Sequence, residues 1–314
     1  MQGKAPYLTF VIICYYKDYQ NALKNIHSIL KSHIPFEYEI LAVYNRCGIY
    51  NKEAESNFYN EIKDLKNTHY LLTTTAKNQY FCRFSVIKFI NSKYTWFIDG
   101  DDSILKIPRK FKNLDYDVVC FNAKTSDDNE WCFGPDREIF KVDADFIAQT
   151  INFTLWNKWI KTEILKKYYA TNKKIVSGED SLYCIYSLIN AKSIKYFDRC
   201  LYSYSKEQQR KFPNCENEQR FEYLLTGNND ILSELKNNVP IEKIKELEYD
   251  RIEYNELAWY LRALDNFKNE EIVKAAEYLK NNFSKDKLKI AFEMMPLELH
   301  YIFKRLDYYG VKIE

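Results

Sequence analysis

Three carboxylates directly follow an apolar stretch that ends at residue 98. Residues 94–98 (Tyr-Thr-Trp-Phe-Ile) have the aromatic and β-branched composition of a buried strand, and Asp99, Gly100, Asp101 and Asp102 come immediately after them. In open α/β sheets, ligands bind at the carboxyl ends of the strands. Carboxylate oxygens suit Mg²⁺ or Mn²⁺, which take one or two protein carboxylates and complete their coordination with water and substrate phosphates. The pattern therefore predicts a metal site that neutralises a diphosphate.

Two other interpretations of these four residues were weighed. A solvated Asp-Gly turn between strands is unfavourable, because three neighbouring carboxylates repel one another. A calcium-binding EF-hand loop is disfavoured, because counting from Asp99 places Ile104 where that loop needs glycine and Lys110 where it needs glutamate. The metal site is the preferred interpretation.

The sequence around this cluster alternates between strand-like and helix-like patterns, which predicts an α/β fold with a mainly parallel central sheet. Expected strands lie at 8–14, 40–43, 70–74, 94–98, 117–121, 139–142 and 194–197, and expected helices lie near 23–30, 54–65, 81–90, 145–151, 161–169 and 179–190.

The pattern becomes wholly helical after about residue 215. Apolar residues recur at helical spacing there, as at Leu257, Leu261 and Leu264. Two domains are therefore predicted: an α/β domain over residues 1–214 and an all-helical C-terminal domain over residues 215–314.

Charge and glycine content limit the function classes. The 314 residues include 46 basic and 44 acidic residues, so the net charge of +2 provides no broad field that would attract nucleic acid, and none is expected as a partner. No glycine-rich phosphate loop (G-x-G-x-x-G or G-x-x-x-x-G-K) occurs, so a bound diphosphate would need a divalent metal instead.

The apolar runs and the cysteine spacing bear on where the protein is expected and on the state of its thiols. The longest apolar run, 8–14, is far shorter than the roughly 20 residues of a membrane span and does not resemble a secretory signal. The eight cysteines form no C-x-x-C pair and are expected to be reduced. The protein is expected in the cytoplasm, with peripheral contact at the inner face of the membrane as an additional expectation.

Several motifs in order resemble those of the family 2 glycosyltransferases, which have the GT-A fold. They are the opening segment 10–18 (Phe-Val-Ile-Ile-Cys-Tyr-Tyr-Lys-Asp), the strand 38–43, Arg83 sixteen positions before Asp99, the segment Leu155-Trp156-Asn157-Lys158, and Gly178-Glu179-Asp180. The resemblance covers about residues 8–205. It implies a Rossmann-like nucleotide-diphospho-sugar transferase domain.

The resemblance also implies roles for individual residues. Asp101 is expected as the main ligand of Mn²⁺ or Mg²⁺, Asp99 as a contact of the ribose and the metal, and Asp102 as a third residue of the metal site that supports the other two. Asp180 is expected to be the general base that accepts the proton of the acceptor hydroxyl while its oxygen attacks the anomeric carbon, which inverts the configuration. Without the resemblance, Ser177-Gly-Glu-Asp180 is simply a helix-capping sequence, and both roles are compatible.

Other side chains are expected to contact the donor or the acceptor. Trp156 is predicted to stack on a sugar and Lys158 to pair with phosphate, although a tryptophan beside Trp159 is by default a core residue. Arg83 is predicted to reach the diphosphate, although an arginine on an amphipathic helix is more often exposed. The full prediction is Tyr15, Tyr44, Asn45, Arg83, Asp99, Gly100, Asp101, Trp156 and Lys158 for the donor, and Glu179 and Trp156 for the acceptor.

Three segments depart from the family pattern. Tyr44-Asn45-Arg46-Cys47 replaces the usual Asp-Asp-Gly-Ser, so the base would be held by an Asn45 hydrogen bond and by stacking on Tyr44. Cys14 and Lys17 replace the usual proline and asparagine of the first loop, and Phe84 follows Arg83 where asparagine is usual. Tyr202 and Tyr204 resemble the family's tyrosines after the catalytic motif, with ordinary packing as the alternative.

The predicted function is an inverting, metal-dependent glycosyltransferase. The expected donor is a UDP-sugar and the expected acceptor a glycan or lipid-linked glycan of bacterial surface polysaccharide, lipooligosaccharide or capsule synthesis. The alternatives are a sugar nucleotidyltransferase and a non-catalytic module that binds glycans or nucleotides. The C-terminal helices, including residues 285–305, are expected to serve self-association or contact with a membrane surface.

Overall fold

The computed structural model divides the chain into two compact units. Residues 1–142 and 150–209 form unit 1, and residues 143–149 and 210–314 form unit 2. The structure describes residues 5–46, 51–74, 79–125, 130–131, 135–140, 154–170, 179–205, 233–240, 242, 257, 261, 264, 269–293 and 301–311. The predicted helix at 145–151 and the predicted boundary between residues 214 and 215 lie outside the described residues, so both stay predictions.

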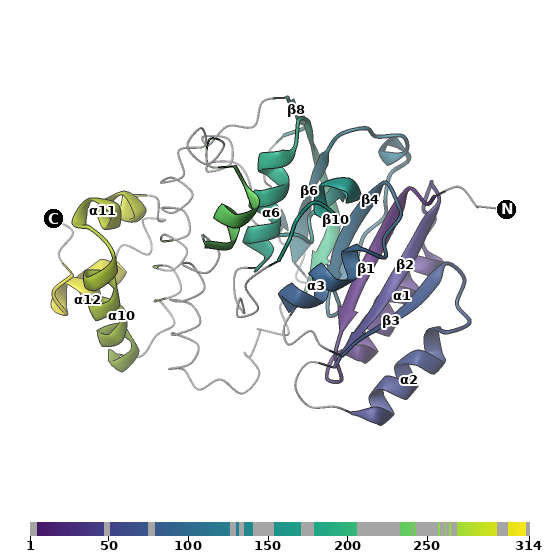
Figure 1. Ribbon diagram of the computed structural model, residues 1–314, viewed down its shortest axis with the longest axis horizontal. Coiled ribbons are helices and arrows are strands. Elements are labelled where there is room, and N and C mark those ends of the chain that lie inside the picture. Colours follow the sequence, from purple (N-terminus) through teal and green to yellow (C-terminus); the bar gives the residue numbers. More distant parts are fainter. Residues whose placement is uncertain are drawn as a thin grey trace. The chain divides into compact units, whose positions relative to one another are not determined.

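Unit 1 is built around one mixed sheet with helices on both faces (Figure 1). The α/β class and the GT-A architecture expected from the sequence are confirmed. The elements of unit 1 are β1 Leu8–Cys14, α1 Tyr19–Lys31, β2 Tyr38–Asn45, α2 Lys52–Ile62, β3 Thr68–Thr73, α3 Gln79–Ile87, β4 Tyr94–Asp99, β5 Ser103–Ile104, η1 Arg109–Phe111, β6 Val118–Thr125, β7 Glu130–Trp131, β8 Arg137–Ile139, β9 Lys158–Lys161, α5 Thr162–Leu165, α6 Glu179–Asn190 and β10 Ile194–Tyr204.

Within the described residues, the strand order of the sheet is β3-β2-β1-β4-β9-β6-β10-β5, with β7 beside β6 and β8 beside β10. Strands β3, β2, β1 and β4 are parallel, and so are β6 and β10. Strand β9 is antiparallel to both of its neighbours, which makes the sheet mixed. All seven residues of β1 are buried, as expected for a central parallel strand covered on both faces.

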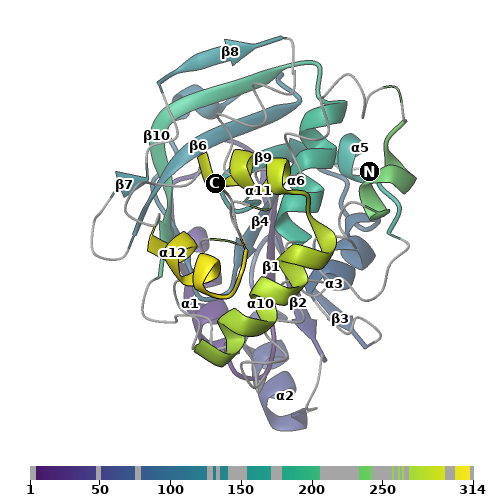
Figure 2. The same ribbon diagram turned by 90° about the vertical axis from the view of Figure 1, so that its left-hand side faces the viewer.

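The helices of unit 1 cover the two faces of the sheet. Figures 1 and 2 place α1 and α2 on one face and α3, α5 and α6 on the other. Helix α1 turns Ala22, Ile26 and Ile29 toward the core at helical spacing. Helix α2 begins with a cap in which the Asn51 side chain accepts a hydrogen bond from the Ala54 N–H at 2.9 Å.

Most elements differ from their predicted extents by a few residues, and two differ by more. Strand β10 runs to Tyr204, well beyond residue 197. Its pairing with β6 shifts between Phe197 and Cys200, and this shift breaks the regular alternation of buried residues that would have indicated the rest of the strand. The predicted helix at 161–169 is shorter: Lys158–Lys161 form β9, and α5 covers Thr162–Leu165. The short β9 was not expected, because four residues give too few alternations to indicate a strand.

Unit 2 is helical in its described residues. It contains α10 Asn269–Asn282, α11 Lys285–Glu293 and α12 Tyr301–Tyr308. Leu257, Leu261 and Leu264 belong to one apolar core with residues of these helices, such as Ile272 and Leu306.

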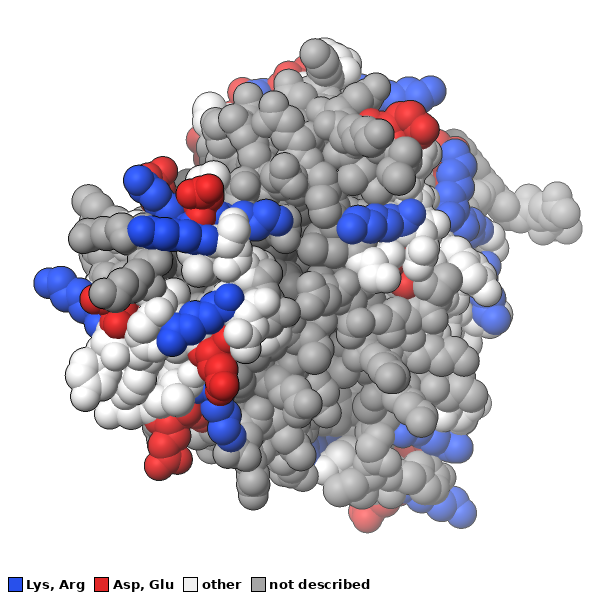
Figure 3. Space-filling view, turned by 60° about the vertical axis from the view of Figure 1, so that its left-hand side comes forward, with Lys and Arg blue, Asp and Glu red and all other residues white. Residues whose placement is uncertain are grey.

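On the face drawn in Figure 3, the described basic and acidic side chains lie interspersed. In the part of the chain that is described, none of the helices is both long and apolar enough to cross a bilayer.

Candidate active site

The Asp99–Asp102 loop lies where β4 ends, beside the end of β1. Asp99 is the last residue of β4 and pairs with Ile13 of β1. A turn closes the loop, with the Asp102 N–H donating to the Asp99 carbonyl at 3.2 Å. A Cβ at Gly100 would lie 3.2 Å from the Ile13 carbonyl oxygen, which is tighter than nine in ten Cβ contacts in proteins. Glycine therefore allows the loop to pass directly over the end of β1.

Asp102 anchors this loop to β10. Its Oδ2 accepts a hydrogen bond from the Tyr202 hydroxyl at 2.6 Å, and its Oδ1 accepts one from the Ser205 N–H at 2.7 Å. Burial and the charge of Asp99 raise the pKa of Asp102 to about 8. Both oxygens of Asp102 are engaged by protein donors, which argues against the metal contact predicted for it; its supporting role stays a prediction.

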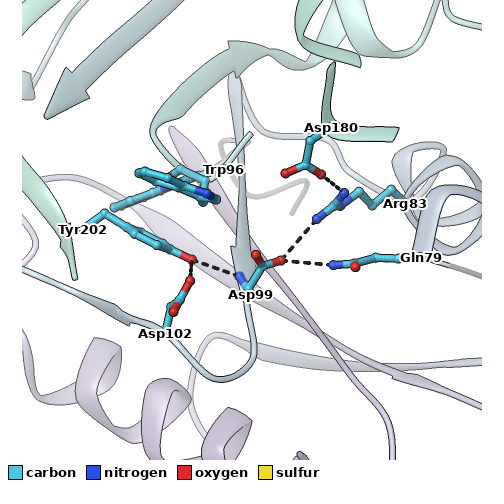
Figure 4. Close-up of polar contacts among 8 residues, drawn as sticks. Gln79, Arg83, Trp96, Asp99, Asp102, Asp180 and Tyr202 are labelled. Carbon is cyan, nitrogen blue, oxygen red and sulfur yellow. Dashed lines mark hydrogen bonds and ion pairs between the residues drawn. The ribbon is translucent and has the colours of Figure 1, made fainter. Parts of the chain in front are cut away.

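Arg83 lies between Asp99 and Asp180 (Figure 4). The guanidinium donates to Asp99 Oδ1 at 3.2 Å through Nη2 and contacts Asp180 Oδ1 through Nη1. Gln79, one turn earlier on α3, also donates to Asp99 Oδ1, at 3.0 Å. Although arginine on such a helix is usually exposed, Arg83 is only 2% exposed. The structure thus brings together the loop predicted to bind the nucleotide and the residue predicted to act as the base.

A tyrosine cluster fixes the two helices that Arg83 connects. The ring centroids of Tyr80 on α3 and Tyr183 on α6 are 5.5 Å apart, and the Tyr183 hydroxyl donates to the Tyr80 carbonyl at 3.2 Å. The Tyr80 hydroxyl is 2.5 Å from that of Tyr168, which follows α5. These contacts hold the first turn of α6, where Asp180 lies, against the helix that presents Arg83.

Asp18 is a further acidic residue of the site, and no role was predicted for it. It follows β1, and its Oδ1 accepts a hydrogen bond from the Tyr15 N–H at 2.7 Å. Burial, together with the negative charges of Asp101 and Asp99, raises the pKa of Asp18 to about 7. The sequence could have indicated this residue, because Asp18 lies in the loop after β1 and the ends of β1 and β4 are adjacent in such a sheet.

The arrangement of these acids decides which kind of metal site they fit. Asp99 and Asp102 already accept hydrogen bonds from protein donors, while Asp101 is a half-buried residue of the same loop. Across the residues that are described, no three His, Cys, Asp or Glu side chains are grouped to hold a metal. The described residues therefore do not form a preformed cage of protein ligands, and Mg²⁺ or Mn²⁺ bound by one or two carboxylates and by donor phosphates stays the prediction.

Three predicted contacts disagree with the packing. Tyr44 is 1% exposed, and its ring packs against Phe58 at 5.8 Å in the core, so it is not available to stack on a base. Trp156 is 3% exposed and stacks on Tyr202 at 4.8 Å, as a core tryptophan would. Lys158 is buried, and its ammonium donates to the Thr154 carbonyl at 2.8 Å and to Asn157 Oδ1 at 2.6 Å, which argues against a phosphate contact.

Two of the remaining predicted contacts, Asn45 and Tyr15, lie at or just after the ends of parallel strands. Asn45 ends β2 and accepts a hydrogen bond from the Thr73 hydroxyl at 3.0 Å. Tyr15 is half-buried in the loop that also contains Asp18. Glu179 begins α6, and Gly178 lies outside the described residues. Contacts of Asn45 and Tyr15 with a donor, and of Glu179 with an acceptor, stay predictions.

The sheet and the acidic loop at the carboxyl end of β4 define the fold class, which is that of a glycosyltransferase of the GT-A type. The solved structures that share this fold include those of TarS of S. aureus. Its 1–349 segment matches with a TM-score of 0.62 and 18% sequence identity over 96% of this chain and 89% of that chain. The complex of this segment with UDP-GlcNAc matches with a TM-score of 0.59, again at 18% identity over 96% and 89% of the two chains.

A longer TarS structure matches with a TM-score of 0.59 and 17% identity; the match covers 98% of this chain but 55% of that chain. No family model and no curated protein matches the sequence. At these identities the structural similarity establishes the fold, and the activity has to be argued from the site.

Proposed function

We propose that this protein is an inverting glycosyltransferase that moves a sugar from a UDP-sugar to a hydroxyl group. The observation that supports this most strongly is the ion pair from Asp99 through Arg83 to Asp180. It joins the loop at the end of β4, where ligands bind in such sheets, to a carboxylate that is 20% exposed and therefore accessible to an acceptor.

In the proposed reaction, the acceptor oxygen attacks the anomeric carbon on the face opposite the diphosphate. The bond between the anomeric carbon and the phosphate oxygen breaks, and its electron pair leaves with UDP. Asp180 accepts the proton of the attacking hydroxyl, and such assistance typically contributes about 10²–10⁴-fold in rate. One displacement at this carbon inverts its configuration.

Asp101 and Asp99 are the residues that would hold Mn²⁺ or Mg²⁺, which when bound neutralises charge on the diphosphate. Gln79 and Arg83 fix the orientation of Asp99 through their hydrogen bonds to its Oδ1. Asp102 and Tyr202 hold the other end of the loop. These contacts keep the loop in one conformation while the donor binds.

UDP is the proposed nucleotide because TarS, which shares the fold, has solved structures in complex with UDP and with UDP-GlcNAc. A glycan or lipid-linked glycan of the bacterial surface is the proposed acceptor, as the family resemblance implies. Self-association or membrane contact through the C-terminal helices also belongs to this proposal.

Nucleotide release from a panel of UDP-, GDP- and CMP-sugars, with Mn²⁺, Mg²⁺ or EDTA, tests the proposal without knowledge of the acceptor, because water can replace it slowly. We expect metal-dependent release of UDP from one or more UDP-sugars. Absence of release from every donor, together with absence of a metal-dependent thermal shift with every nucleotide, would contradict it.

A further inference from the structure

We propose that Arg83 is a positioning residue that holds the base Asp180 in a fixed place relative to the Asp99–Asp102 loop. This inference rests on the proposed function, and it gives Arg83 a role different from the diphosphate contact expected from the sequence. The role is exerted through Asp180 and requires no contact with the sugar.

The burial of Arg83 favours this role. The side chain is 2% exposed and the side chain of Asp99 is 7% exposed, whereas that of Asp180 is 20% exposed. Of the three side chains, that of the proposed base Asp180 is the most accessible to an acceptor, and that of Arg83 is the least exposed. A buried arginine between two acids is strongly constrained, because its removal would leave the buried Asp99 carboxylate without this cation.

The geometry of the guanidinium explains how one side chain can serve both acids. Two different nitrogens, Nη2 and Nη1, contact Asp99 and Asp180. The planar guanidinium fixes the angle between these donors, whereas the ammonium of lysine is a single point charge without a fixed fork. The position of Asp180 is thus determined by that of Asp99.

The surroundings of Arg83 hold the guanidinium in place. Its central carbon lies 5.7 Å from the ring centroid of Phe97 on β4, and Gln79 shares the Asp99 oxygen with it. The packing of Tyr80 against Tyr183 keeps α3 and α6 together. Contacts with β4 and with α3 therefore fix the orientation of the Arg83 side chain. A side chain that positions another residue has to be fixed in this way.

A double-mutant cycle tests this role in the full chain. The variants are Arg83→Gln, Asp180→Asn and the combination of both, with Arg83→Lys as the conservative replacement. The matched control is Lys88→Gln, which removes a positive charge from an exposed residue just after α3. The readouts are the rate of UDP release from UDP-GlcNAc with Mn²⁺, the Kd of UDP from calorimetry, and the Tm.

We expect Arg83→Gln to slow UDP release on the order of 10²-fold or more, as loss of the base does. In the Asp180→Asn background, the same replacement should change the rate by no more than about twofold, because its effect acts through Asp180. The Kd of UDP should rise by no more than about threefold, because Gln79 still donates to Asp99 Oδ1 and restrains the loop. Arg83→Lys should recover part of the rate, and Lys88→Gln should match the wild type.

Two results would overturn the role of Arg83: rate losses that multiply in the double variant, or a Kd of UDP that rises at least about tenfold, as expected for a direct diphosphate contact. If Arg83→Gln does not fold, Arg83→Lys decides, because wild-type activity in that variant would show that the fork is not needed. If the wild type releases UDP from another UDP-sugar of the panel, that sugar replaces UDP-GlcNAc in the assay. Absence of release from every donor, together with absence of a metal-dependent thermal shift with every nucleotide, would contradict the proposed function itself.

Discussion

The hydroxyl of Tyr202 lies 2.6 Å from Asp102 Oδ2 and also accepts a hydrogen bond from the Asp99 N–H at 3.2 Å. One fully buried hydroxyl on β10 therefore connects the first and last residues of the acidic loop (Figure 4). The face of the Tyr202 ring packs on Trp156, so the position of the hydroxyl is fixed by the core of unit 1.

Replacement of Tyr202 by phenylalanine tests this connection. We expect Tyr202→Phe to lower the free energy of unfolding by about 1–3 kcal/mol, because the Asp99 N–H and the Asp102 carboxyl group each lose a buried partner. The affinity for UDP should fall as well, since the loop is less constrained. Urea denaturation and calorimetry measure both effects. The control Tyr59→Phe, at an exposed tyrosine, should change neither.

The raised pKa of Asp18 predicts how stability depends on pH in the metal-free protein. The pKa is about 7 in the folded state and near 3.8 in the unfolded chain, so between these values the folded state binds more protons. Stability should therefore fall as the pH rises from about 4 to about 7, and the loss should be complete above this window.

The variant Asp18→Asn cannot ionise but keeps an oxygen that can accept from the Tyr15 N–H. Relative to the wild type, it should be more stable at pH 8 by on the order of a few kcal/mol, and the difference should shrink toward pH 4. Thermal unfolding in EDTA across this pH range measures it. Equal pH dependence of the two proteins would show that Asp18 is not the responsible group.

The fold could be predicted where the apolar pattern is long and regular. Strand β1 and helix α6 have the predicted bounds, 8–14 and 179–190. Strand β9 and the end of β10 could not be predicted, because one is only four residues long and the other contains a shift in its pairing. The antiparallel direction of β9 depends on long-range contacts that local patterns do not contain.

The site could be predicted in part. The acidic loop and Asp180 were found from their motifs, and the structure places them on either side of Arg83. Burial was the property that the sequence could not provide: Tyr44, Trp156 and Lys158 have side chains suited to a ligand, yet they lie within the core. Gln79 lies four positions before Arg83 and therefore on the same face of α3, so the sequence could have indicated that it also contacts Asp99.

Replacement of Gly100 by alanine tests the close approach of the loop to β1. The added Cβ would meet the Ile13 carbonyl oxygen at 3.2 Å and the Ala22 Cβ at 3.5 Å. Because one of these atoms belongs to the backbone of a central strand, we expect a loss of about 1–3 kcal/mol in the free energy of unfolding. Weaker UDP binding should accompany it. Wild-type stability and affinity would show that the loop can move outward without cost.

Metal binding should depend on Asp101. With UDP present, Mn²⁺ is expected to raise the Tm of the wild type, because a ligand that binds only the folded state stabilises it. Asp101→Asn should lose most of this increase, whereas Asp64→Asn, at an exposed aspartate, should retain it. If the increase persists in Asp101→Asn, this residue is not the metal ligand.

The rate of UDP release by Asp180→Asn, compared with its affinity for UDP-GlcNAc, tests the central claim most directly. If Asp180 is the base, release should slow by about 10²–10⁴-fold, while calorimetry should still detect binding of the donor. Asp64→Asn serves as the control for the same chemical change at the surface. Release at the wild-type rate by folded Asp180→Asn protein would contradict the assignment of the base.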